Sequence, residues 1–141
     1  MSALKNFTPS EQIKEWCKNT MIDYLGIEVT EIGDKYICGR MPVDHRTHQP
    51  MGLLHGGASV VLAESLASMG AALQVDLTKK ACVGLEINAN HMRAVREGWV
   101  YARATATHVG RTTQVWETRI TNEAGDLVCI SRMTVAIIDK N

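Results

Sequence analysis

Glu64 is the residue of this sequence whose surroundings most strongly indicate chemistry. It stands within residues 58–75, an alanine-rich apolar run without proline. Such a run predicts a buried helix, and a carboxylate is rarely buried without a partner or a function. No lysine or arginine lies three or four residues away to pair with it. We interpret Glu64 as a working carboxylate; the alternative is that it reaches a strand arginine or the solvent edge of the helix.

Two neighbouring features could act with Glu64. Ser68 lies four residues further on, so a helix would place it about 6 Å away on the same face. His55-Gly56-Gly57 lies where the helix should begin, and free N–H groups at such a position stabilise negative charge on a carbonyl oxygen. Glycine allows that oxygen to approach the backbone closely. The alternative is that these residues only start the helix.

The distance along this helix predicts a dimer. Gly56 and Glu64 are eight residues apart, which is about 12 Å along a helix axis. One carbonyl group cannot touch both residues of a single chain. If both serve one reaction, Gly56 must act with Glu64 of the partner subunit, across a pair of antiparallel helices.

Other segments predict the elements that position these residues. Thr8-Pro9-Ser10-Glu11 has the form of a capping box and predicts a short helix over about 9–18. A longer central helix is expected over about 57–75. Residues that alternate between apolar and polar predict a hairpin and four further strands, at 25–32 and 35–43 and then at 81–92, 98–109, 112–122 and 127–139.

An apolar helix followed by long antiparallel strands predicts an α+β hotdog fold. In this fold a curved antiparallel sheet of five to six strands wraps a long central helix. The length of 141 residues fits a single domain over 1–141. The alternative is an α+β sandwich with the helix on one face, in which case the helix should carry a clear polar stripe.

Composition narrows the class of protein. The chain is 45% hydrophobic and 21% charged with a net charge of zero, which is typical of a globular protein and gives no indication of a nucleic-acid or membrane partner. It shows no signal peptide or membrane-spanning run, so a cytoplasmic protein is expected. Four scattered cysteines are expected to be reduced thiols. His45 and His48 lack a third ligand, so no metal site is predicted.

Positively charged residues gather near two predicted strand ends. One group comprises His91, Arg93 and Arg96, and Arg111 ends the next strand. Neighbouring strand ends could bring these side chains together around phosphate groups. The alternative is a solvated rim of the sheet.

Residues 49–65, QPMGLLHGGASVVLAES, closely resemble hotdog-fold acyl-CoA thioesterases of the PaaI/4-hydroxybenzoyl-CoA thioesterase type. The resemblance is nearest to the members that act on 1,4-dihydroxy-2-naphthoyl-CoA and that proofread enterobactin synthesis, and it covers about 21–138. It implies hydrolysis of aromatic or medium-chain acyl-CoA, or of acyl-carrier thioesters, without a cofactor. It also implies a homodimer that pairs into tetramers.

The same resemblance implies a role for each matching residue. Glu64 is the nucleophile or general base, and the Gly56 N–H polarises the thioester carbonyl. His55 assists at that carbonyl or at the leaving thiolate, while Gln49 and Ser68 position the attacking water or carboxylate. The implied acyl pocket is lined by Leu66–Ala67 and Met69–Ala71. The implied CoA cleft consists of Gly84, His91, Met92, Arg93, Ala94, His108, Val109, Gly110, Arg111, Thr112 and Thr113.

Two alternative functions remain open from the sequence. A hotdog hydratase or dehydratase would also use a helix carboxylate, but with a histidine in a Gly-His-Phe-Pro-type loop, and this sequence contains no such loop. A non-catalytic acyl-CoA-binding module would need the cleft but not Glu64.

Overall fold

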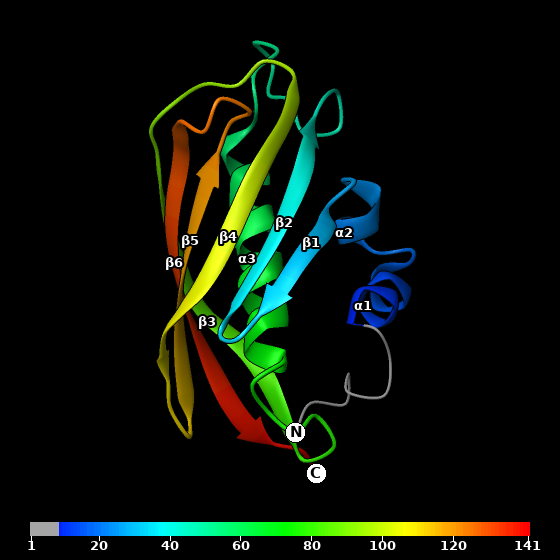
Figure 1. Cartoon of the computed structure of the whole chain (residues 1–141), viewed down its shortest axis with the longest axis vertical. Helices are drawn as coiled ribbons and strands as arrows, with labels where there is room; N and C mark the ends of the chain where they lie inside the picture. Colours follow the sequence, from blue (N-terminus) through cyan, green and yellow to red (C-terminus); the bar gives the residue numbers. More distant parts are fainter. Residues whose placement is uncertain (1–8) are drawn as a thin grey trace.

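The computed structural model describes residues 9–141, which form one long helix, two short helices and six strands (Figure 1). Thr8, the expected cap of the first helix, lies outside the described residues. The elements in chain order are α1 (Pro9–Cys17), α2 (Met21–Tyr24), β1 (Glu28–Gly33), β2 (Tyr36–Val43), α3 (Gly56–Ala72), β3 (Lys80–His91), β4 (Gly98–Val109), β5 (Thr113–Thr121) and β6 (Leu127–Asp139).

The six strands form one antiparallel sheet in the order β1-β2-β4-β5-β6-β3. Helix α3 packs across one face of this sheet and contacts β2 to β6. Figure 1 views the sheet from its other face, with α3 behind β2 and β4. This arrangement confirms the predicted α+β hotdog fold with its central helix.

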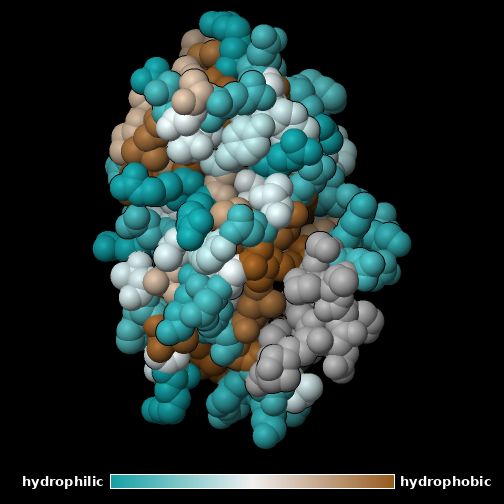
Figure 2. Space-filling view, in the orientation of Figure 1, coloured by the Kyte–Doolittle hydropathy of each residue, from teal (hydrophilic) through white to brown (hydrophobic). Residues whose placement is uncertain are grey.

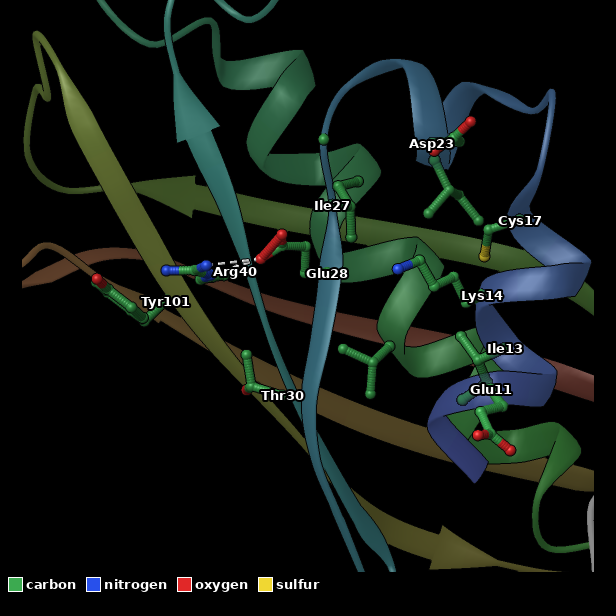
Figure 3. A pocket seen from close by; sticks show the side chains of 13 residues that line it. Glu11, Ile13, Lys14, Cys17, Asp23, Ile27, Glu28, Thr30, Arg40 and Tyr101 are labelled. Carbon is green, nitrogen blue, oxygen red and sulfur yellow. Dashed lines mark hydrogen bonds and ion pairs between the residues drawn. The ribbon is translucent and has the colours of Figure 1, made fainter. Parts of the chain in front are cut away.

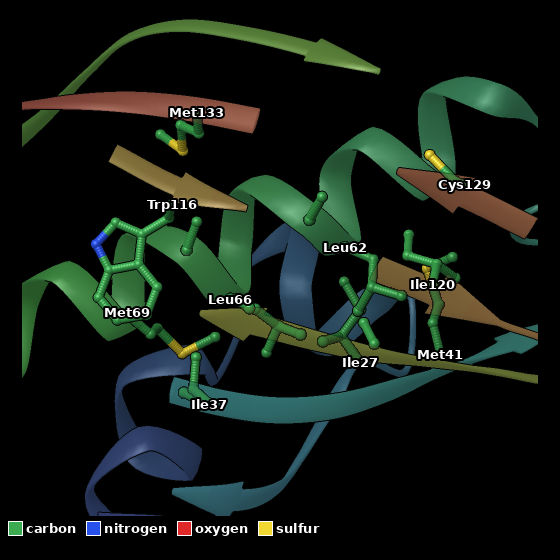
Figure 4. Packing of buried hydrophobic residues seen from close by; sticks show 14 of the residues in the cluster. Ile27, Ile37, Met41, Leu62, Leu66, Met69, Trp116, Ile120, Cys129 and Met133 are labelled. Atoms are coloured by element: carbon green, nitrogen blue, oxygen red, sulfur yellow. The ribbon is translucent and has the colours of Figure 1, made fainter. Parts of the chain in front are cut away.

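The core lies between α3 and the sheet. Leu62 and Leu66 point from the helix towards the strands and are fully buried. Figure 4 shows them among Ile37 and Met41 of β2 and Ile120 of β5. The spacing of four residues between the two leucines keeps both on one face of α3. Burial of this face fixes the rotation of the helix and therefore decides which side chains remain outside.

The last turn of α3 is held against β5. Gln114 is fully buried, donates to the Ala71 carbonyl oxygen at 3.3 Å and accepts from the Trp116 indole N–H at 2.8 Å. The Trp116 ring lies against Gly70, so close that a Cβ at position 70 would be 2.7 Å from two ring atoms. Gly70 is thus required by packing at this point of the helix.

Replacing Gly70 by alanine should lower the free energy of unfolding by about 1–3 kcal/mol, because the buried Trp116 and Ile37 leave no space for a methyl group. Helix propensity alone predicts a gain of about 1 kcal/mol. Urea denaturation followed by circular dichroism measures the difference. In a Trp116→Phe background the cost should be smaller. A Gly70→Ala protein as stable as the wild type would contradict this packing.

Three sequence predictions were wrong in detail. Residues 25–27 do not belong to β1, which begins at Glu28 after the unpredicted short helix α2. Helix α3 ends at Ala72, three residues before the expected end. It is also not buried all round, because only its sheet-facing side is covered within the chain and Glu64 is exposed. Glu64, Ser65 and Ser68 are exposed or half-buried, whereas Ser59 is buried.

The two edges of the sheet differ. Helix α1 packs beside β1 and covers that edge (Figure 1). At the other edge, β3 pairs only with β6 among the described strands. Its side chains Val83 and Leu85 are 43% and 62% exposed. A long edge strand with exposed apolar side chains is typical of a surface that another chain covers.

No described helix is long and apolar enough to cross a membrane.

Candidate active site

His55 caps the N-terminus of α3. Its backbone is extended, and its Nδ1 accepts the Gly57 N–H at 2.7 Å. The His55 carbonyl oxygen accepts from Ala58 and Ser59 at 3.0 and 3.3 Å. These bonds satisfy the N–H groups of Gly57, Ala58 and Ser59, so the Gly56 N–H is the one in the first turn of α3 that has no acceptor among residues 9–141. Gly56 therefore offers a free backbone donor at the positive end of the helix.

The capping bond also sets the tautomer of His55. A ring nitrogen that accepts a hydrogen bond carries no proton, so the neutral ring carries its proton on Nε2. His55 can thus order the helix start with one nitrogen and donate a hydrogen bond with the other. Sequence analysis did not identify this cap, since Ser, Thr, Asp and Asn are the usual residues at that position.

Gln49 lies in a tight turn that precedes the cap. Its carbonyl oxygen accepts the Gly52 N–H at 2.9 Å, and Gly52 has the positive φ of +77° that this turn requires. The side-chain oxygen of Gln49 accepts the Met51 N–H. The acceptor end of the Gln49 amide is therefore engaged, and its NH₂ group remains available to donate to a bound ligand.

Thr47 anchors the same loop, and the sequence analysis missed it. It is 2% exposed, and its hydroxyl donates to the Pro42 carbonyl oxygen at 2.9 Å. Its own carbonyl oxygen accepts the His55 N–H at 2.8 Å, and its hydroxyl accepts the Asp44 N–H at 3.1 Å. The end of β2 is thereby joined to the start of α3. A polar residue three positions after an aspartate, typical of local turns, was the available signal.

Asp44 and Arg46 complete the anchor of this loop. The Arg46 guanidinium donates to both carboxylate oxygens of Asp44, at 3.1 and 2.7 Å, and the Arg46 backbone N–H donates at 2.9 Å. These bonds to Arg46 lower the pKa of Asp44 to about 2. The folded protein therefore stabilises the charged form of Asp44.

The loop anchor should make stability depend on pH in a defined range. Because the pKa of Asp44 is lower in the folded chain, at about 2, than in an unfolded one, at about 3.9, its contribution is complete above pH 4 and is lost as pH falls towards 2. We expect Asp44→Asn to lower the melting temperature above pH 5 and to match the wild type near pH 2. Calorimetry with Asp34→Asn, at an exposed turn, as control measures this. A difference that persists unchanged to pH 2 would contradict the assignment.

Glu64 lies on the side of α3 that the sheet does not cover. Its side chain is exposed, and Oε2 is 3.4 Å from the position that a Cβ of Gly84 on β3 would take. Ser68 is half-buried one turn further on, and its hydroxyl is 4.0 Å from the Met133 sulfur. No hydrogen bond joins Glu64 to Ser68 within the described chain. The predicted burial of Glu64 is therefore wrong for a single chain, which leaves the carboxylate open to a ligand or a second subunit.

The two halves of the predicted site lie apart. Gly56 and Glu64 belong to the same regular helix α3, so about 12 Å separates them along the axis. Gln49 and His55 lie at the Gly56 end, whereas Ser68 and Gly84 lie with Glu64. No single carbonyl group can contact both halves of one chain.

The two groups of predicted CoA-cleft residues also lie apart. His91 pairs with Cys129 near the start of β6, whereas Thr113 pairs with Ala136 near its end. Seven residues of strand separate these positions, which is about 23 Å. Met92–Ala94 therefore lie at one end of the sheet and the β4–β5 turn, with Arg111, at the other. The prediction that neighbouring strand ends bring these cations together is wrong within one chain, because the strands are antiparallel and the turns alternate between ends.

The residues expected to line an acyl pocket belong to the core instead. Leu66, Ala67 and Ala71 are almost fully buried between α3 and the sheet, and Gly70 is covered by Trp116. Figure 4 shows Leu66 and Met69 directed towards the strands. Their side of the helix is occupied within the chain, so an acyl group must contact the open side.

A cavity of about 700 Å³ lies elsewhere, between α1, α2 and β1. Figure 3 shows Lys14, Ile27 and Arg40 around it, with Arg40 paired to Glu28 at 2.8 Å. None of the predicted site residues lines this cavity.

In the view of Figure 2, hydrophilic residues cover most of the outer face of the sheet, and hydrophobic residues gather in a strip on the side where Figure 1 draws α1.

A model of the thioesterase superfamily matches residues 51–129, which include the start of α3 and Glu64. The chain belongs to the thioesterase superfamily. This thioesterase is 48% identical to a 1,4-dihydroxy-2-naphthoyl-CoA hydrolase from Escherichia coli over 128 residues, which cover 91% of this chain and 93% of that protein. It is 47% identical to proofreading thioesterase EntH from Cronobacter turicensis over 119 residues, covering 84% and 86%.

Solved structures give the same result for the fold. A mutant thioesterase from Pseudomonas aeruginosa superposes with a TM-score of 0.93 at 49% identity, covering 96% of this chain and 98% of the other. A thioesterase from Haemophilus influenzae superposes with a TM-score of 0.91 at 47% identity, covering 99% and 96%. The resemblance seen in residues 49–65 is confirmed, and the chain is an enzyme of the thioesterase class.

Proposed function

We propose that this thioesterase hydrolyses aromatic or medium-chain acyl-CoA thioesters at a site shared by two subunits. The free N–H of Gly56 and the exposed carboxylate of Glu64, about 12 Å apart on one helix, carry the proposal. Antiparallel pairing of two α3 helices would bring Gly56 of one protomer to Glu64 of the partner subunit. Each dimer would then hold two identical sites.

The edge strand β3 supports the same pairing. Its exposed side chains Val83 and Leu85 favour contact with a second copy, and its edge is open among the described residues. Two antiparallel β3 strands related by a two-fold axis would place the His91 end of one beside the Lys80 end of the other. The β4–β5 turn of the partner subunit would then approach Met92–Ala94, so that one phosphate-bearing ligand could contact both groups of the proposed CoA cleft.

The chemistry requires only water as co-reactant. Glu64 accepts a proton from water that attacks the thioester carbonyl carbon, or attacks that carbon itself and is then released by water. The Gly56 N–H stabilises the negative charge that forms on the carbonyl oxygen, and the His55 Nε2–H assists there. In either route the tetrahedral intermediate collapses as the carbon–sulfur bond breaks, and CoA leaves as a thiolate that takes up a proton. In the covalent route water then hydrolyses the anhydride formed with Glu64, so the products of both routes are the free acid and CoA. The Gln49 amide and Ser68 hydroxyl position the attacking group.

A panel of benzoyl-CoA, hydroxybenzoyl-CoA and C6–C12 acyl-CoA substrates tests the proposal, with release of free thiol as the readout. We expect hydrolysis of aromatic or medium-chain members and no hydration of crotonyl-CoA. Rates of hydrolysis measured with acyl-carrier-protein thioesters of the same acids show whether the enzyme prefers CoA or the carrier protein as the thiol part of its substrate. Hydration of crotonyl-CoA, or CoA binding without turnover of any thioester, would contradict the proposal.

A further inference from the structure

The imidazole of His91 lies against Gly56. Ring atoms Nε2, Cε1 and Cδ2 are 2.9, 3.2 and 3.3 Å from the position that a Cβ of residue 56 would take. His91 is the last residue of β3, and its side chain is exposed. The Nε2 edge of the ring therefore faces the first turn of α3, beside the one free backbone N–H of that turn.

The geometry limits the distance between the two donors. A backbone nitrogen is about 2.5 Å from the Cβ of the same residue, so Nε2 of His91 lies within about 5.4 Å of the Gly56 nitrogen. An oxygen that accepts two hydrogen bonds of about 2.9 Å can connect donors up to about 5.8 Å apart. One carbonyl oxygen can therefore reach both the Gly56 N–H and His91 Nε2.

The other histidine at this end is partly engaged. His55 uses Nδ1 to cap α3 at 2.7 Å, whereas the side chain of His91 makes no hydrogen bond to any of residues 9–141. An unengaged imidazole next to a free N–H, at an exposed helix start, is a ready donor for a carbonyl oxygen. His91 thus lies at the start of α3, where the proposed function requires the thioester carbonyl.

We propose that His91 is a catalytic residue whose Nε2–H is a second donor to the thioester carbonyl oxygen held by the Gly56 N–H. This role rests on the proposed function and adds a residue to its oxyanion site. It differs from a role in holding the nucleotide of CoA, because a donor at the carbonyl acts on every thioester, including those that lack a nucleotide.

Matched variants test the role. His91→Leu keeps the size of the side chain but removes the donor, and His91→Gln keeps an N–H near the position of Nε2. Substrates are benzoyl-CoA and benzoyl-N-acetylcysteamine, which lacks the nucleotide. We expect His91→Leu to lower kcat by about 100-fold on both substrates with little change in KM, and His91→Gln to recover much of the loss. His45→Leu, at an exposed loop position, should behave as wild type.

Two outcomes would overturn the role of His91. One is a loss confined to benzoyl-CoA or to KM, which would indicate a nucleotide contact. The other is a His91→Leu protein with wild-type kcat on both substrates. Melting temperatures identify a variant that fails to fold, and His91→Gln then provides the test through its kcat on the two substrates. Glu64→Gln separates the two proposals: if it remains active, the proposed function fails, whereas an inactive Glu64→Gln beside an active His91→Leu rejects only the role of His91.

Discussion

Glu64→Gln should lower kcat for benzoyl-CoA hydrolysis by about 10²- to 10⁴-fold, because glutamine cannot accept a proton from water or attack the carbonyl carbon. KM should change little, since the amide keeps the size of the carboxylate. The fold should persist, because Glu64 is exposed and forms no ion pair within the described chain. Free-thiol release measures kcat, and thermal unfolding checks the fold.

The matched control is Glu117→Gln. Glu117 lies on β5 and pairs with Arg119 at 3.5 Å, on the face of the sheet away from α3. Glu117→Gln removes one negative charge from the protein, as Glu64→Gln does, but at a site away from α3. The kcat of the Glu117→Gln protein should therefore equal that of the wild type. An active Glu64→Gln protein, or an equal loss in both variants, would refute the role of Glu64 as the working carboxylate.

Gly56→Pro should lower kcat by about 10²- to 10³-fold, because proline removes the one free N–H at the start of α3. Proline is favoured at the first position of a helix, so α3 should still form. His55 already has φ −70° and ψ 130°, the conformation that a residue before proline prefers. The substitution therefore deletes a donor with little change to the backbone.

Gly56→Ala is the control for this change. It adds the same Cβ, which must displace the His91 ring by a few tenths of an ångström, but it keeps the N–H. The difference in kcat between the alanine and proline variants isolates the backbone donor. Equal values for the two variants would show that the N–H of Gly56 does not stabilise the transition state.

The strands of the sheet could be predicted well from the sequence, because the pattern that marks each strand and each turn lies within a few neighbouring residues. Alternating residues in 98–109 and 127–139 marked β4 and β6, and the glycine-containing breaks marked the turns between antiparallel strands. Helix α2 was missed because four residues are too few to show a helical period. Helix α3 was recognised from its alanine-rich composition, although its end was placed three residues too late.

The sequence could not predict which side of α3 is covered. Leu62 and Leu66 face the sheet, whereas Glu64 faces outward. Val60 and Val61 are as apolar as the two leucines, yet both are only partly buried. A residue that packs against a second subunit has the same composition as one that packs in its own core. The contact between His91 and Gly56 joins residues 35 positions apart, and no local pattern reports such a contact.

The shared site is the central claim, and mixed dimers test it most directly. Glu64→Gln and Gly56→Pro subunits, each inactive alone, are co-expressed in equal amounts with different tags. Random pairing makes half of the dimers mixed, and each mixed dimer holds one site with both Gly56 and Glu64 intact. We predict recovery of about one quarter of wild-type kcat in the mixture and about half in purified mixed dimers. Mixed dimers no more active than the parent variants would show that the site lies within one protomer.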